Sequence, residues 1–132
     1  MCWNWTTWST EAVVRRFSAK DFRGCPFVNA VAELGSEDRS VRRIAIDFKE
    51  SRRLWFRNLL VQLGVGDAEG LATQLALLVD GSIAQDLVRN DPAMARAARE
   101  AATVLLKNAG IEITGSDLPE EARYKPRAAR KE

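Results

Sequence analysis

The chain has 132 residues, of which 46% are hydrophobic and 29% charged, and its formal net charge is +2. This length suits one hydrophobic core rather than two, and the composition is that of a globular domain rather than a disordered segment. The small net charge gives no argument for nucleic-acid binding. The sequence has no histidine, which excludes Cys-and-His zinc sites and Cys-His catalysis.

The N-terminal residues and the cysteines indicate in which cellular compartment the protein resides. The start, Met1 to Trp5, lacks the basic region of a secretory signal, and no apolar run reaches membrane-spanning length. The two cysteines, Cys2 and Cys25, lie far apart in the sequence. We therefore expect a reduced, cytoplasmic protein with no membrane contact.

Residues 1–9 are expected to form an irregular leader that holds three of the four tryptophans. This leader is interpreted either as an aromatic binding patch or as a non-native stretch left by a truncated or misassigned start. The second interpretation is preferred, because no periodicity organises the rings. A short helix is predicted over residues 11–19, with Ser9 or Thr10 as its N-cap.

The next helix is predicted from Pro26 to Leu34, after a break at Gly24, since proline fits the first turn of a helix. Cys25 is interpreted as a small packing residue in preference to a reactive thiol, because no histidine is available to activate it. Asn29 is polar among apolar neighbours. It is expected either to anchor a ligand in a pocket or to make a structural hydrogen bond to a neighbouring loop.

A long helix of about 25 residues is predicted after the cap segment Ser36-Glu37-Asp38. Its apolar stripe consists of Val41, Ile44, Phe48, Trp55, Leu59 and Leu63. The other face is basic and carries Arg42, Arg43, Lys49, Arg52, Arg53 and Arg57. A solvated surface is the preferred interpretation of the basic face over a phosphate contact, because no aromatic residues interleave with the arginines.

Gly64-Val65-Gly66-Asp67 fits neither the dinucleotide nor the P-loop pattern, so it is interpreted as a helix stop followed by an N-cap at Asp67. The apolar spacing predicts a helix over residues 68–89. Gly81 interrupts the interior of this helix at a cost of roughly 0.5 to 1 kcal/mol, which close approach of another helix or room for a ligand would offset. The neighbouring Asp80 is left with three alternatives: it faces the pocket, caps a broken turn or points into solvent.

Asp91 and Pro92 are predicted to open a final helix that extends to about Ala109. This helix is rich in alanine, and small side chains let helix axes approach closely, as in a bundle or a subunit interface. A surface helix of high intrinsic propensity is the alternative. Residues 110–132 are predicted to be a polar, mostly mobile tail.

Three segments together resemble the C-terminal domain of TetR-type transcriptional regulators. They are the segment Phe22-Arg23-Gly24-Cys25-Pro26-Phe27-Val28-Asn29-Ala30, the Asp80-Gly81 pair inside a leucine-rich helix, and the joint Asn90-Asp91-Pro92. The resemblance extends from residue 11 to residue 109, about three quarters of the chain. It implies an all-α, antiparallel domain of about five helices over residues 10–109.

In that family the C-terminal domain dimerises and binds a small inducer, while a separate helix-turn-helix domain reads the operator. Nothing before residue 11 matches such a DNA-reading domain, so DNA contact is expected only through a domain absent from this sequence. The resemblance implies a homodimer through the last two helices. The residues expected at this interface are Leu71, Gly81, Met94, Ala98, Ala101 and Leu105.

The earlier helices are expected to enclose a pocket for a largely hydrophobic small molecule. Its expected lining is Asn29 as polar anchor, with Phe27, Phe48, Trp55, Phe56, Leu59, Leu75 and Leu78. The same side chains are equally compatible with a solid core. A helical scaffold, or a dominant-negative dimerisation partner without a cavity, is therefore kept as the alternative. No enzyme activity, cofactor or metal is expected, because the sequence offers no placed nucleophile and base.

Overall fold

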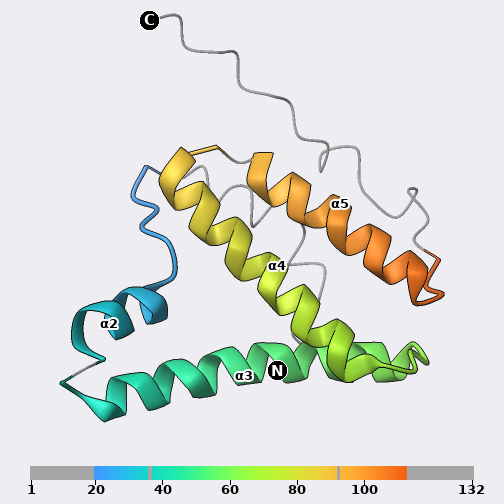
Figure 1. Cartoon of the computed structure of the whole chain (residues 1–132), viewed down its shortest axis with the longest axis horizontal. Coiled ribbons are helices and arrows are strands. Elements are labelled where there is room, and N and C mark those ends of the chain that lie inside the picture. Colours follow the sequence, from blue (N-terminus) through green and yellow to red (C-terminus); the bar gives the residue numbers. More distant parts are fainter. Residues whose placement is uncertain (1–19, 36, 92, 113–132) are drawn as a thin grey trace, which may run out of the picture.

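The computed structural model describes residues 20–35, 37–91 and 93–112, and these contain four α-helices and no β-strand (Figure 1). The helices are α2 (Pro26–Leu34), α3 (Arg39–Gln62), α4 (Ala68–Arg89) and α5 (Ala93–Asn108). The all-α prediction is confirmed for this part of the chain. The leader 1–9, the helix predicted over residues 11–19 and tail residues 113–132 lie outside the described residues.

Local side-chain chemistry fixes the helix ends. Asp38, Asp67 and Asp91 each accept a hydrogen bond from a backbone N–H two or three residues further on, at 2.7, 2.9 and 2.9 Å. Caps of this kind are each worth about 1 kcal/mol. The predicted caps at Asp67 and Asp91 are confirmed, as is Pro26 in the first turn of α2. The last helical turn of α4 is closed by Asn90, whose left-handed φ of 50° suits asparagine.

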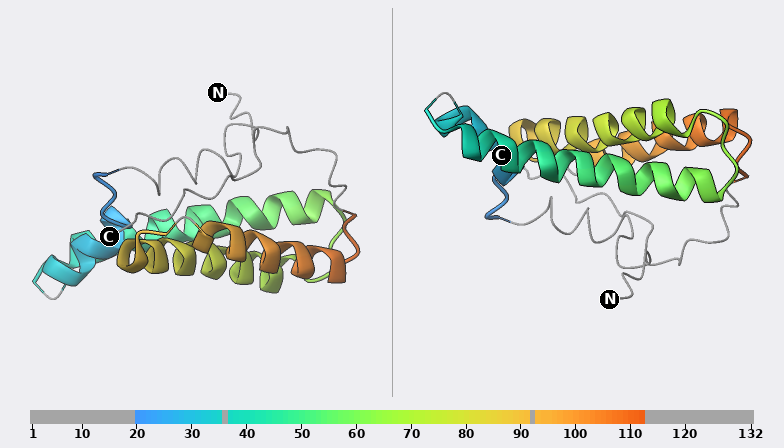
Figure 2. Two further views of the ribbon diagram at one scale, coloured as in Figure 1. Left: turned by 90° about the horizontal axis from the view of Figure 1, so that it is seen from above. Right: turned by 90° about the horizontal axis from the view of Figure 1, so that it is seen from below.

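The helices pack mainly against their neighbours along the chain. The middle helix, α4, contacts α3 on one side and α5 on the other, and α2 packs on α3. Figure 2 shows the three long helices edge-on as a thin layer. This arrangement leaves α4 as the central element, which both α3 and α5 need as a partner.

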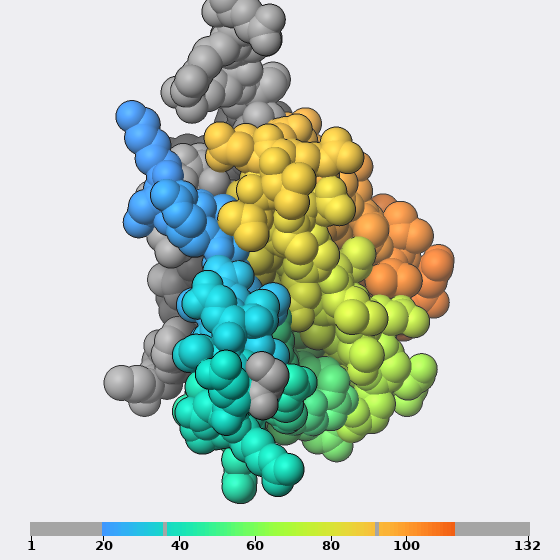
Figure 3. All heavy atoms as spheres, turned by 60° about the vertical axis from the view of Figure 1, so that its left-hand side comes forward, coloured from blue at the N-terminus to red at the C-terminus, as the bar shows by residue number. Residues whose placement is uncertain are grey.

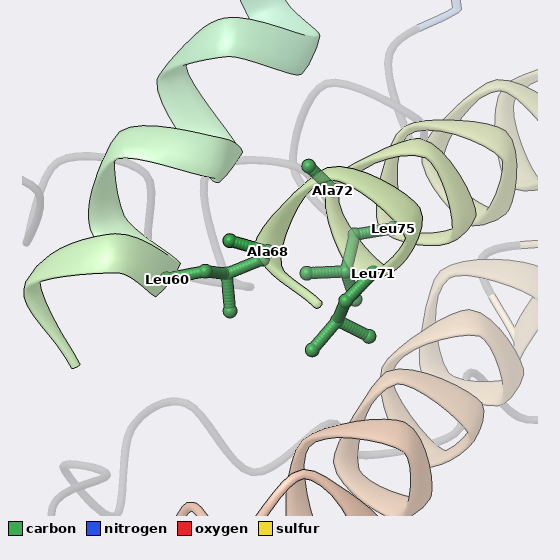
Figure 4. Packing of buried hydrophobic residues seen from close by; sticks show 5 residues of the cluster. All are labelled: Leu60, Ala68, Leu71, Ala72 and Leu75. Carbon is green, nitrogen blue, oxygen red and sulfur yellow. The ribbon is translucent and has the colours of Figure 1, made fainter. Parts of the chain in front are cut away.

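The core lies where α3 turns into α4. Buried leucines and alanines from these two helices form it (Figure 4). Partly buried apolar side chains from α5 and the connections pack against them. The buried members are Leu60, Ala68, Leu71, Ala72 and Leu75. Phe56 and Leu105 are among the side chains packed against them. Leu75 and Phe56, predicted to line a pocket, are therefore core residues, and so are the predicted interface residues Leu71 and Leu105.

Only part of the predicted apolar stripe of α3 packs against another helix: Val41 and Phe48 are partly buried, and Phe48 stacks on Phe27 of α2. Ile44 and Leu63 are 59% and 61% exposed, and Trp55 is 42% exposed. The inward face carries Ala45, Lys49, Arg52, Phe56 and Leu60. The stripe prediction is corrected on this point. The physical reason is that long cationic side chains cover apolar surface with their stems while their charged ends find a partner.

Candidate functional site

A groove of about 440 Å³ lies between α2, α3 and α4, and we call it the α2–α3–α4 groove. Figure 3 looks onto the side of the molecule where these helices come together. Half of its lining is apolar: Phe27, Val28, Val31, Ala45, Ile46, Ala76 and Leu77. The polar half consists of Arg42, Lys49, Glu50, Arg52, Arg53, Thr73 and Asp80.

One carboxylate joins α4 to α3 at the wall of the groove. Oδ1 of Asp80 accepts a hydrogen bond from Lys49 Nζ at 2.6 Å and from Arg52 Nη1 at 2.8 Å. All three side chains are partly buried, with exposed fractions of 28%, 17% and 33% for Lys49, Arg52 and Asp80. We call them the Asp80 cluster. Asp80 thus pairs with two cations of α3 at the α2–α3–α4 groove, which differs from the pocket that the sequence predicted.

An aromatic pair continues this wall toward α2. The rings of Phe27 and Phe48 stack with centroids 4.0 Å apart and an interplanar angle of 15°. The guanidinium of Arg52 lies 5.1 Å from the centroid of Phe48, within cation–π range. The Asp80 cluster and the aromatic pair therefore form one continuous set of contacts from α4 through α3 to α2.

A second ion network links α3 to the start of α4. Arg53 donates to both carboxylate oxygens of Glu50, at 2.9 and 2.5 Å, and also to Glu69. Arg57 pairs with the same Glu69 at 2.6 Å. The hydrogen bonds from Arg53 lower the pKa values of Glu50 and Glu69. This network stands at the rim of the groove, because Glu50 and Arg53 also line it.

Only one of the predicted pocket residues, Phe27, lines the groove. Phe48 stacks behind it, and Leu78 is partly buried elsewhere on α4. Trp55 and Leu59 stay 42% and 36% exposed on the outward side of α3. Among the described residues, the side chains predicted to line one pocket fall on different faces of α3 and α4.

Asn29 makes the structural bond that was one of its two predicted roles. Its Nδ2 donates to the carbonyl oxygen of Arg23 at 2.7 Å, which ties α2 to the loop before it. Cys25 is buried and not in a disulfide, in agreement with its interpretation as a packing residue. Neither side chain lines the groove.

Sequence reasoning missed the ionic half of the site. It assigned Lys49, Arg52 and Arg53 to a solvated face, and the structure corrects this assignment by turning them toward α4. The available signal was Asp80, an acid in an apolar helix that needed a cation. The small residues Ala45 and Ala76, which leave the groove its space, gave no signal of their own.

The predicted interface residues that are not in the core lie on α4 and α5. Met94 and Ala98 are half-buried, and Ala101 is exposed. Gly81 is exposed, and apart from its own stretch of helix no atom of the described residues lies within 4 Å of where its Cβ would be. Gly81, Ala84 and Val88, all exposed, form what we call the outer α4 stripe. Packing among the residues that the structure describes thus gives no reason for a glycine at position 81.

A buried acid lies outside the groove, near the end of α4. Asp86 is 1% exposed, and among the described residues no group makes a hydrogen bond of good geometry to its carboxylate, although the backbone N–H of Asp91 favours the ionised form. Burial raises the pKa of Asp86, and the charge of Asp91 adds to the effect. An unpaired buried carboxylate destabilises the fold once it is ionised.

Comparisons with known proteins find no relative of this chain. No family model, no curated protein and no solved structure matches this chain.

Among residues 20–35, 37–91 and 93–112, no group of three or more Cys, Asp or Glu side chains is placed to hold a metal ion. Within the same residues, no helix has both the length and the apolar character needed to cross a membrane.

We expect Asp86→Asn to stabilise the protein at neutral pH. The folded-state pKa of Asp86 lies above its ordinary 3.8, so the folded state keeps a proton that the unfolded state releases. Stability therefore falls as the pH rises from 3.8 through the folded-state pKa. The neutral amide does not ionise, so the variant avoids this loss of stability. In urea unfolding from pH 3 to pH 8, the free energy of unfolding of the variant should rise relative to that of the wild type as the pH increases.

The matched control is Asp47→Asn, which removes a carboxylate from an exposed position of α3. It should leave the pH dependence of unfolding as it is in the wild type. A lower stability of Asp86→Asn at neutral pH would show instead that Asp86 is ionised and usefully paired in the fold.

Proposed function

We propose that this chain is the effector-binding and dimerisation domain of a TetR-type transcriptional regulator acting in the cytoplasm. In this proposal the α2–α3–α4 groove takes up a largely apolar small molecule, and the helices described here do not themselves read DNA. The support is of two kinds. The three sequence segments carry the resemblance, and the all-helical fold is compatible with it.

The observation that carries the ligand-binding part is the groove itself. Its volume of about 440 Å³ is within the range of small-molecule sites, about 300–1,000 Å³. Seven apolar side chains from three helices line it beside a few polar groups. Such a mixture binds an apolar body by burial and orients it through the polar groups.

The outer α4 stripe favours the dimerisation part. Val88 is 83% exposed, and Gly81 leaves room for a helix to approach closely. The exposed Ala101 on α5 adds a further small side chain. A symmetric pairing through α4 and α5 would bury these groups and give Gly81 a close contact, which the described part of this chain does not supply.

Ligand binding is tested by filling the groove. Ala76→Phe places a ring in the lining, and we expect it to reduce binding of the fluorescent apolar probe N-phenyl-1-naphthylamine at least tenfold. Val28→Ser, at a half-exposed lining position, should weaken binding without crowding the helices. A saturating probe should also raise the stability of the wild type, by about 2.7 kcal/mol at a hundred times its Kd.

Ala97→Phe adds the same ring at an exposed site on α5 and serves as the control for ligand binding. Its probe affinity should equal that of the wild type. Equal binding by Ala76→Phe, or no binding by the wild type, would rule out the groove as an effector site and favour the helical scaffold.

Dimerisation is tested by light scattering at micromolar concentration. We expect a wild-type dimer, and a monomer for Gly81→Glu, because a charge at a close contact is desolvated. The space around Gly81 means that the variant monomer can fold unchanged. Ala101→Glu should act in the same direction, whereas Ala32→Glu on the exposed side of α2 should remain dimeric. A monomeric wild type would end the dimer proposal.

A further inference from the structure

The groove carries a charge that a purely apolar ligand does not need. Four cations and two anions line it, which gives its walls a net charge of +2. The cations are Arg42, Lys49, Arg52 and Arg53, and the anions are Glu50 and Asp80. Cations in a partly desolvated wall attract an anion more strongly than the same cations do in open solvent.

The Asp80 cluster places unused donors at the groove. Within the described part of the chain, Lys49 and Arg52 each donate one hydrogen bond, and both bonds go to the same oxygen of Asp80. An ammonium offers three donors and a guanidinium five. The single carboxylate of Asp80 balances only one of the two positive charges of Lys49 and Arg52. It also leaves most of their N–H donors without a partner in the cluster.

The apolar and ionic parts of the wall are continuous. Arg52 lies over Phe48, which stacks on Phe27, and the apolar lining of α2 continues from there. A ligand that lay along this wall would meet apolar side chains over its body and two cations at one end. We propose, as an extension of the proposed effector site, that the groove binds amphipathic anions: small molecules with an apolar body and one acidic group, which pairs with Lys49 and Arg52.

In this arrangement Asp80 holds the two cations in place and also competes with the ligand's acidic group for them. If Asp80 competes with the ligand, removing its charge should strengthen anion binding. A purely structural role of Asp80 would not predict this. Asp80→Asn leaves two cations with no counter-ion, so it should strengthen the binding of an anion while slightly loosening the contact between α3 and α4.

The test uses two fluorescent probes with the same ring system. 8-Anilinonaphthalene-1-sulfonate carries an acidic group, and N-phenyl-1-naphthylamine does not. We expect the sulfonate to bind the wild type several-fold more tightly, and added salt, from about 0.05 to about 0.5 M, to weaken the sulfonate alone. This comparison needs no substitution, so it does not depend on any variant folding.

Two substitutions then locate the charge effect. Asp80→Asn should raise the ratio of sulfonate affinity to neutral-probe affinity several-fold, and Lys49→Met should lower this ratio. Glu100→Gln and Lys107→Met make the same changes of charge at exposed sites on α5 and should alter neither affinity. Ala76→Phe should abolish tight binding of both probes.

The outcomes separate this inference from the function on which it rests. If both probes bind equally well, remain sensitive to Ala76→Phe and ignore the charge variants, the groove is an effector site but not one for anions. If Ala76→Phe changes neither probe's binding, the proposed function fails together with this inference. Weaker sulfonate binding by Asp80→Asn would show that Asp80 supports the site rather than competing with its ligand.

Discussion

Asp80 is shared by two cations of α3, and this shared carboxylate accounts for the face that α3 turns toward α4. Lys49 and Arg52 reach the same oxygen from positions three residues apart, which lie on one side of a helix. Holding both contacts requires the basic side of α3 to pack inward. The apolar residues Ile44 and Trp55 then remain exposed.

The same orientation places the core and the groove at different ends of the pair of helices. Near the connection between them, Leu60 and Leu75 belong to one cluster of buried apolar side chains. Further along, the facing residues Ala45 and Ala76 are small, and the long side chains of the Asp80 cluster span the gap instead of filling it. The groove is thus a consequence of ionic packing between helices whose apolar contacts are concentrated elsewhere.

The helices could be predicted from the sequence because their signals are local. Asp67, Asp91 and Pro26 mark helix starts through contacts within a few residues, and helix period and capping are enough to find them. The site could not be predicted in the same way. Periodicity identifies an apolar stripe on α3 but does not show that cationic stems will be buried in its place. Asn29 illustrates the same limit, since its spacing is equally compatible with a ligand and with the carbonyl of Arg23.

The central claim is that the Asp80 cluster holds α3 against α4, and a double-mutant cycle tests it most directly. Urea unfolding of the wild type, Lys49→Met, Asp80→Asn and the double variant gives the coupling free energy between the two side chains. We predict a favourable coupling of about 0.5 to 1 kcal/mol that shrinks as salt is added, as expected for a partly buried ion pair. Additive effects of the two substitutions, with no coupling at low salt, would contradict this account.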